Sequence, residues 1–252
     1  MSLLVKICGL STRETLEVAL DAGADMVGFV FFAPSPRHID LPAMSRLVDM
    51  ARGRAETAVL TVDAEDGILE RIVQQVRPDW LQLHGTESVD AVAAVKQAFG
   101  VRVMKALPIA ARGDLDRIPR YAAVADRLLF DARPPKEATR PGGLGATFDW
   151  RLLEKLDIGV PFMVSGGLDA GNVAEAVRVT RAAGVDVSSG VERAPGVKDG
   201  EMIRAFIRAA RGADLASPLP VYGERSDQPL TPTLSPQVRG EGAKTARRRQ
   251  KK

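Results

Sequence analysis

Residues 80–107 read WLQLHGTESVDAVAAVKQAFGVRVMKAL and contain two short apolar runs separated by a helical pattern. The runs at 80–84 and 102–107 have the length and composition of buried β-strands. Between them, SVDAVAAVKQAFG (88–100) begins on Ser88 and ends on Gly100, which are typical helix start and stop signals. The segment therefore predicts a strand, a helix and a second strand.

The same unit recurs from residue 1 to about residue 210. The strand candidates are 3–8, 26–31, 57–62, 80–84, 102–107, 127–131, 161–165 and 185–189. Helical patterns between or after them include 12–23, 68–76, 88–100, 172–184 and 200–211. Near-continuous apolar strands, each followed by a helix, indicate a buried parallel sheet, and eight strands can close into a barrel. We therefore predict a single-domain α/β protein, a (β/α)8 TIM barrel, over residues 1–211.

A doubly wound open sheet is the structural alternative. That fold would need glycine-rich dinucleotide chemistry after an early strand, whereas the first turn here reads CGLST (8–12). The spacing of about 25 residues per unit leaves no room for a second domain within the first 211 residues.

The composition limits the class of protein. With 252 residues, 45% of them hydrophobic and 27% charged, the chain can bury one substantial core. Its single cysteine excludes an internal disulfide and a cysteine-based metal cluster. The apolar runs all fall short of the roughly 20 residues that a membrane span needs. Because the N-terminus also enters a strand without a charged leader, we expect a cytoplasmic protein.

The positive charge belongs to the C-terminal tail. Residues 212–252 hold eight Lys and Arg and four Asp and Glu, whereas residues 1–211 hold 27 and 28. The tail contains PLTPTLSPQVRGEG (229–242), lacks periodicity and is predicted to be disordered. It resembles translated intergenic repeat sequence, which favours an extension without function. Binding of nucleic acid or an anionic surface through ARRRQKK (246–252) is the less favoured interpretation.

Polar and small residues concentrate where the predicted strands end. The strand ends of such a barrel form one rim, and the loops that follow them build the active site. These loops carry, in chain order, Cys8, Arg37, His84, Asp131, SGG (165–167) and SSG (188–190).

The two glycine-containing turns predict a phosphate site. Backbone N–H groups at Gly166, Gly167, Ser189 and Gly190 can bind a phosphate dianion without a lysine. The loops after strands seven and eight are also the usual phosphate site of this fold. Ordinary tight turns are the alternative, but two such motifs in the expected pair of loops favour phosphate binding.

Cys8 and Asp131 are the candidate base and acid. A cysteine in an apolar run is usually a small core residue, but Cys8 lies at a strand exit before a glycine and should face the cleft. A carboxylate at Asp131 would be costly in a core, so it either pairs with a cation, Arg133 being the nearest in sequence, or acts as an acid. A thiol and a carboxyl group at one rim suit proton transfer in an isomerisation.

His84 and Arg37 each have two interpretations. His84 can orient the substrate or a neighbouring group, or it can be a hydrogen-bonded structural histidine. Arg37 can pair with a substrate carboxylate in fork geometry, or it can be a solvated loop residue. From the residues alone we expect a cofactor-free isomerase or epimerase that acts on a phosphorylated small molecule.

These motifs also identify a family. The segments VKICGL (5–10), LQLHG (81–85), LFDARPP (129–135), PGGLGATFDW (141–150) and GVDVSSGVERAPGVKD (184–199), with two others, resemble the phosphoribosylanthranilate isomerases of tryptophan biosynthesis. The resemblance covers residues 3 to about 210 in the right order. KICG and DVSSGVE with its downstream PG and KD are its most specific parts.

The resemblance implies an Amadori rearrangement of N-(5′-phosphoribosyl)anthranilate to 1-(2-carboxyphenylamino)-1-deoxyribulose 5-phosphate. Asp131 would protonate the ring oxygen and Cys8 would take the C2′ proton. Arg37 would hold the anthranilate carboxylate, and Asp186 would line the anthranilate side. The resemblance implies no metal or redox cofactor, and a monomer or a homodimer.

Two positions depart from the family pattern. Leu144 and Ala146 replace polar or basic residues of the loop after strand six, so the resemblance assigns no substrate contact there. The competing enzymes fit less well: the sister isomerase of histidine biosynthesis has aspartate at the position of Cys8, and indoleglycerol-phosphate synthase needs a catalytic lysine and glutamates. A non-catalytic phosphate binder would be expected to lack Cys8 or Asp131.

Overall fold

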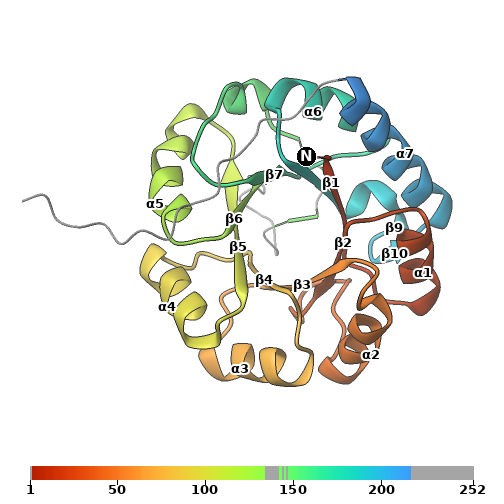
Figure 1. The fold of residues 1–252 in the computed structure, drawn as a ribbon, viewed down its shortest axis with the longest axis vertical. Helices are drawn as coiled ribbons and strands as arrows, with labels where there is room; N and C mark the ends of the chain where they lie inside the picture. Colours follow the sequence, from red (N-terminus) through yellow and green to blue (C-terminus); the bar gives the residue numbers. More distant parts are fainter. Residues whose placement is uncertain (1, 134–141, 144, 146, 217–252) are drawn as a thin grey trace, which may run out of the picture. The chain divides into compact units, whose positions relative to one another are not determined.

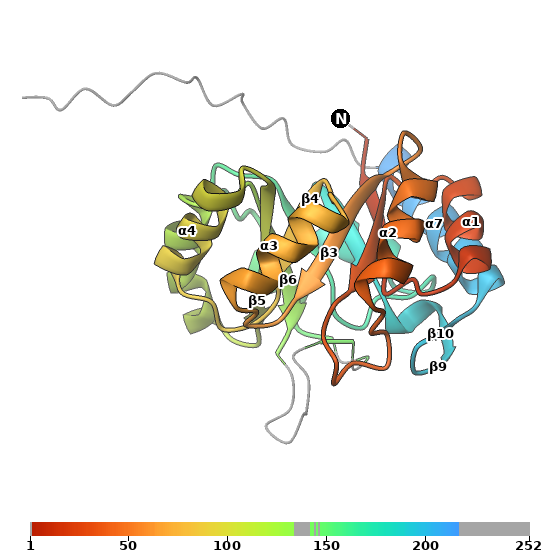
Figure 2. The ribbon, with the colours of Figure 1, turned by 90° about the horizontal axis from the view of Figure 1, so that it is seen from below.

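The computed structural model of the chain is a closed barrel of eight parallel strands ringed by helices (Figure 1). It describes residues 2–133, 142–143, 145 and 147–216. Figure 2 shows the helices standing around the strands, with the first residues at the end of the barrel opposite the β9–β10 hairpin (Glu192–Ala194 and Val197–Lys198). The predicted (β/α)8 TIM barrel is confirmed.

The strands pair in chain order, and β8 pairs with β1 to close the barrel. Their bounds agree with the predicted ranges to within two residues at each end. They are β1 (Leu4–Cys8), β2 (Met26–Val30), β3 (Glu56–Thr61), β4 (Trp80–Leu83), β5 (Arg102–Ile109), β6 (Arg127–Ala132), β7 (Phe162–Val164) and β8 (Gly184–Val187).

The helices pack on the outside of the strands. They are α1 (Arg13–Asp21), α2 (Leu41–Ala51), α3 (Asp66–Gln75), α4 (Val89–Phe99), α5 (Ile118–Ala122), α6 (Val173–Thr180) and α7 (Gly200–Ala216), with the 3₁₀ turns η1 (Arg112–Arg117), η2 (Trp150–Leu153) and η3 (Ser189–Val191). Side chains of Thr12, Asp40 and Ser88 accept hydrogen bonds from backbone N–H groups in the first turns of α1, α2 and α4. These N-caps satisfy donors that the helix itself leaves unpaired.

Strand alternation divides the core into two layers. The larger layer lies between strands and helices and contains residues such as Val5, Ile7 and Val185. The smaller layer fills the barrel interior with Met26, Ala58, Trp80, Met104, Ala106, Leu129 and Met163. Because successive strand residues face opposite sides, Lys6 and Cys8 share the inward face of β1. The same alternation brings catalytic candidates from several strands to one mouth.

Two sequence expectations need correction. The helical pattern 172–184 ends at Thr180, because Arg181 adopts a left-handed conformation (φ 50°) and terminates α6. Gly184, expected to stop this helix, instead begins β8, where an added Cβ would lie 2.9 Å from the carbonyl oxygen of Leu4. In the described part of the β6–β7 connection, the helical segment is the short turn η2 instead of a full helix.

The end of the barrel lies beyond the predicted boundary. Helix α7 continues past Arg211 to Ala216, and Ala213 is buried. The tail predicted to be disordered therefore falls, apart from its first five residues, outside the described part of the chain. Within the described residues, no helix is long and apolar enough to span a membrane.

The packing of α7 predicts the first stability test. Phe206 is fully buried, whereas Met202 on the same helix is 37% exposed. Removing the buried ring leaves a cavity, so we expect Phe206→Ala to lower the free energy of unfolding by about 3–5 kcal/mol. Met202→Ala, the matched control, should change it by less than about 0.5 kcal/mol in urea unfolding. Equal effects of the two substitutions would contradict this packing.

Candidate active site

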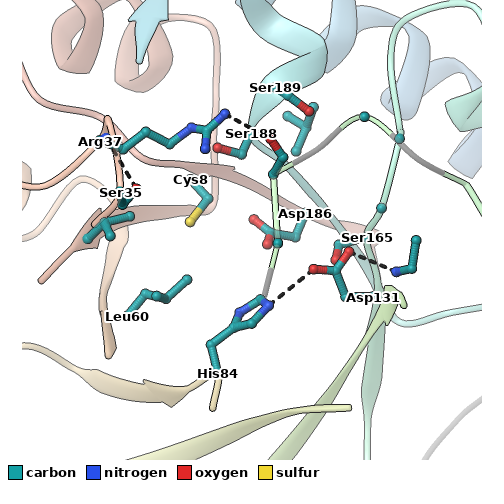
Figure 3. Close-up of a pocket in the computed structure, with 18 of the residues that line it drawn as sticks. Cys8, Ser35, Arg37, Leu60, His84, Asp131, Ser165, Asp186, Ser188 and Ser189 are labelled. Atoms are coloured by element: carbon teal, nitrogen blue, oxygen red, sulfur yellow. Dashed lines mark hydrogen bonds and ion pairs between the residues drawn. The ribbon is translucent and has the colours of Figure 1, made fainter. Parts of the chain in front are cut away.

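One open pocket at the carboxyl ends of the strands collects most of the predicted site residues (Figure 3). Its lining includes eight of the nine: Cys8, Arg37, His84, Asp131, Gly166, Gly167, Asp186 and Ser189. The ninth, Gly190, lies beside the pocket. An added Cβ there would lie 1.8 Å from the carbonyl oxygen of Leu168, so only glycine lets the loops after β7 and β8 approach this closely.

Cys8 lies at the end of β1, above a buried ion pair. Lys6 Nζ is 2.9 Å from Asp186 Oδ1, and the two side chains are 0% and 7% exposed. This contact follows from the register, since Lys6 of β1 pairs directly with Asp186 of β8. Cys8 faces the same interior as Lys6, one inward position further along the strand, and is 3% exposed.

The groups around Cys8 act on its pKa in opposite directions. Burial raises the pKa of the Cys8 thiol above its ordinary value, and the Asp186 carboxylate adds to this increase. The Lys6 and Lys198 ammonium groups oppose this increase. For Lys6, burial lowers the pKa, but Asp186 and Cys8 outweigh that effect and leave the pKa raised. The resting site therefore holds a neutral thiol beside a charged lysine.

Asp131 lies one residue before the end of β6 and is held by a backbone N–H group and an imidazole. Its Oδ1 accepts the backbone N–H of Ala132 at 2.9 Å, and its Oδ2 lies 3.1 Å from Nε2 of His84. Arg133, the cation nearest in sequence, instead forms an ion pair with Asp114. The pairing of Asp131 with Arg133 that the sequence left open is therefore wrong, and the carboxyl group faces the pocket.

Arg37 lies on the loop between β2 and α2 and lines the pocket. Its guanidinium group is bound to a carboxylate of the protein. Its Nε and Nη2 donate to Glu192 Oε1 and Oε2, each at 2.7 Å. Lys198 donates to Glu192 at 2.8 Å and to the backbone oxygen of Ser188 at 2.8 Å. Burial raises the pKa of Glu192, but Arg37 and Lys198 outweigh it and leave the pKa below its ordinary value. Arg37 is thus a fixed, buried guanidinium rather than a solvated loop residue.

The loops after β7 and β8 present unused backbone donors. Within the described residues, no hydrogen-bond partner occurs for the N–H groups of Gly166, Gly167, Ser189 and Gly190. Asn172 holds the first loop in place by donating from Nδ2 to the Gly167 carbonyl at 2.9 Å. Unpaired backbone N–H groups in neighbouring loops can bind an anion.

The loop after β6 closes one side of the pocket. An added Cβ at Gly142 would lie 2.8 Å from Asp131 Oδ2 and 3.0 Å from His84 Nε2, so the backbone of this loop lies directly against the Asp131 carboxyl group. Leu144 and Ala146, the two departures from the family pattern, lie outside the described residues. In the part of the chain that the structure describes, no three His, Cys, Asp or Glu side chains group as metal ligands.

Sequence reasoning missed Lys6, Gln82, Glu192 and Lys198. Lys6 carried a usable signal, because a lysine in the middle of a buried strand needs a charge partner. Glu192 and Lys198 stand among the residues that mark the family, but their contact with Arg37 joins segments far apart in the chain. Gln82, whose Nε2 lies 3.0 Å from His84 Nδ1, occupies the inward position before His84.

A TIM barrel with a thiol, a carboxyl group and unused backbone N–H donors at one mouth is typical of enzymes that transfer protons on phosphorylated small molecules. The model of the N-(5′-phosphoribosyl)anthranilate (PRA) isomerase family matches residues 5–209. The chain therefore belongs to the phosphoribosylanthranilate isomerase family, which confirms the resemblance found in its sequence motifs.

Individual relatives agree with this assignment. N-(5′-phosphoribosyl)anthranilate isomerase of Afipia carboxidovorans is 63% identical over 224 residues, covering 89% of this chain and 95% of the relative. That of Bradyrhizobium diazoefficiens is 66% identical, covering 86% and 97%. The crystal structure of the Thermotoga maritima phosphoribosyl anthranilate isomerase matches with a TM-score of 0.76 at 33% identity, covering 83% of this chain and 99% of that one.

The charges around Cys8 predict opposite effects of two substitutions. Lys6→Met removes a cation that lowers the pKa of Cys8 and leaves Asp186 unpaired, so the pKa should rise. Asp186→Asn removes an anion that raises it, so the pKa should fall. Because Cys8 is the single cysteine, the rate of iodoacetamide alkylation as a function of pH reports its thiolate fraction directly. Shifts in the same direction would contradict this arrangement.

Proposed function

We propose that this chain converts N-(5′-phosphoribosyl)anthranilate to 1-(2-carboxyphenylamino)-1-deoxyribulose 5-phosphate, with Asp131 as the general acid and Cys8 as the general base. The observation that carries the proposal is the placement of both groups in one pocket with separate partners. A related structure contains reduced 1-(o-carboxyphenylamino)-1-deoxyribulose 5-phosphate bound to a phosphoribosyl anthranilate isomerase; it matches this chain at 30% identity with a TM-score of 0.72.

Asp131 acts in the first step. Its carboxyl proton passes to the furanose ring oxygen while the bond between that oxygen and C1′ breaks, and the nitrogen lone pair forms an iminium at C1′. Asp131 lines the pocket and forms no ion pair with Lys or Arg among the described residues. It can therefore exchange a proton with the substrate without first losing such a partner.

Cys8 acts in the second step. Its thiolate removes the C2′ proton, the C–H electron pair forms the C1′–C2′ double bond, and the iminium nitrogen is neutralised. The resulting enolamine tautomerises to the ketone. Because burial favours the neutral thiol at rest, the thiol first releases its proton to solvent in the pocket. The new iminium charge adds to Lys6 and Lys198 in stabilising the thiolate that this leaves.

The two ends of the substrate have separate binding groups. Arg37 lines the pocket and would hold the anthranilate carboxylate, with Glu192 keeping the guanidinium in place. The phosphate would be held by the N–H groups of Gly166, Gly167, Ser189 and Gly190, as the sequence predicted. Asp186 would reach the anthranilate side of the pocket while it pairs with Lys6. Binding at both ends holds C2′ within reach of the base.

The wider setting follows the same proposal. The partner is a phosphorylated small molecule, and no residue of the proposed site needs a metal or a redox cofactor. We place the reaction in the cytoplasm, where a single reduced cysteine is expected to persist. The chain would act as a monomer or a homodimer, with His84 as a positioning group for Asp131.

Substitution of the acid and the base tests the assignment. We expect Cys8→Ser and Asp131→Asn each to lower kcat/KM by about 10²–10⁴-fold, because each removes a proton-transfer group. Asp49→Asn, at an exposed carboxylate on α2, is the matched control and should leave activity unchanged. A fluorescence assay of phosphoribosylanthranilate consumption provides the measurement. Near-normal turnover in either site variant would refute its role, and an inactive parent chain would refute the function.

We also propose that the tail contributes nothing to catalysis. A chain ending at Ala216 keeps all of α7 and should retain kcat/KM within about twofold. A chain ending at Arg211 loses the buried Ala213 and the last turn of α7. Its free energy of unfolding in urea should therefore fall by about 1–2 kcal/mol. If the chain that ends at Ala216 had unchanged stability but reduced turnover, residues 217–252 would have a function in catalysis.

A further inference from the structure

Gln82 is a buried polar residue that the proposed chemistry does not use. It lies on the inward face of β4, is 0% exposed and pairs in the ladders with Leu60 and Met104. It is not part of the pocket lining. An amide in such apolar surroundings is costly unless it is hydrogen-bonded, so its contacts indicate what it does.

The amide makes one contact and leaves one atom unpaired. Gln82 Nε2 lies 3.0 Å from Nδ1 of His84, whereas Oε1 is buried and has no partner among the described residues. An amide nitrogen can only donate, so Nδ1 of His84 must accept. The proton of the neutral imidazole then lies on Nε2, which is 3.1 Å from Asp131 Oδ2 and donates to it.

This arrangement leaves His84 with no free basic nitrogen. Its Nε2 carries the hydrogen that Asp131 accepts, and the lone pair on Nδ1 is occupied by Gln82. We propose that Gln82 is a positioning residue that fixes His84 in the Nε2–H tautomer, so that the proton used for ring opening is held by Asp131 and not by His84. The inference rests on the proposed role of Asp131 as the acid.

The role of the Gln82 Nε2 donor is clear from what an acceptor in its place would do. An acceptor at the position of Nε2 would favour a proton on Nδ1, and the ring could then exist as an imidazolium or as the opposite tautomer. In either state His84 competes with the substrate for the acidic proton. Gln82 thus acts through His84 and has no need to touch the substrate.

Nitrogen NMR of the imidazole rings tests this directly. The chain has two histidines, so two ring spin systems are expected, assigned with His84→Gln and His38→Gln. In the full-length wild-type chain we expect His84 to be protonated on Nε2 and unprotonated on Nδ1. A proton on Nδ1 would overturn the inference without any further variant. His38, whose Nδ1 accepts the Phe32 N–H at 3.1 Å, is the internal reference.

Two substitutions connect the tautomer to turnover. Gln82→Met, which removes the donor at similar length, should mix the His84 tautomers and lower kcat about tenfold while KM changes less than about twofold. Gln82→Glu, which supplies an acceptor, should protonate both ring nitrogens and lower kcat further. Thr61→Val is the matched control, because Thr61 is a buried polar residue on the adjacent strand whose hydroxyl has no partner in the described structure.

The outcomes separate this inference from the proposed function. Loss of kcat with unchanged His84 signals would show that Gln82 acts only on folding, and would overturn the inference. Altered His84 signals with normal kcat would overturn it too, while leaving the Asp131 assignment intact. That assignment fails only if Asp131→Asn remains active. A Thr61→Val variant that reproduced the Gln82→Met effects would also contradict the inference.

Discussion

The closure of the barrel and the surroundings of the proposed base, Cys8, both depend on the buried ion pair of Lys6 and Asp186. An unpaired ammonium group in this interior would cost several kcal/mol, so the pairing of β1 with β8 has to bring a carboxylate to Lys6. The parallel register of β1 and β8 places this carboxylate beside Lys6, because Lys6 and Asp186 are direct partners in the ladder. The first and last strands are thus joined by opposite charges as well as by backbone hydrogen bonds. Cys8, at the next inward position, takes its electrostatic environment from the same pair.

The two sides of the pocket differ in how charge is arranged. On the side of Cys8, cations and carboxylates form buried ion pairs, and Lys6, Asp186 and Lys198 act on the pKa of the thiol. On the side of Asp131, the contacts are the N–H of Ala132 and the imidazole of His84. Cations on one side favour a thiolate, whereas neutral donors on the other orient a carboxyl group. The proposed acid and base therefore lie in different electrostatic surroundings within one cavity.

The fold and most of the site followed from the sequence because both depend on local patterns. Strand period, helix caps and the rule that strand ends share a rim placed Cys8, His84 and Asp131 together. The contacts that pattern analysis missed join distant segments: Lys6 to Asp186 depends on barrel closure, and Arg37 meets Glu192, 155 residues later. The helix end at Arg181 was also missed, because a non-glycine residue in left-handed conformation carries no clear sequence signal.

The charges also give a reason for the proposed phosphate site to use backbone donors. The buried cations on the Cys8 side already have partners, since Lys6 binds Asp186 and Lys198 binds Glu192. A lysine placed in the loops after β7 or β8 would compete for these carboxylates and would change the charge that Cys8 experiences. Neutral N–H groups can bind a dianion without adding a charge of their own. In this arrangement the proposed phosphate-binding groups are separate from the charged groups that act on the pKa of Cys8.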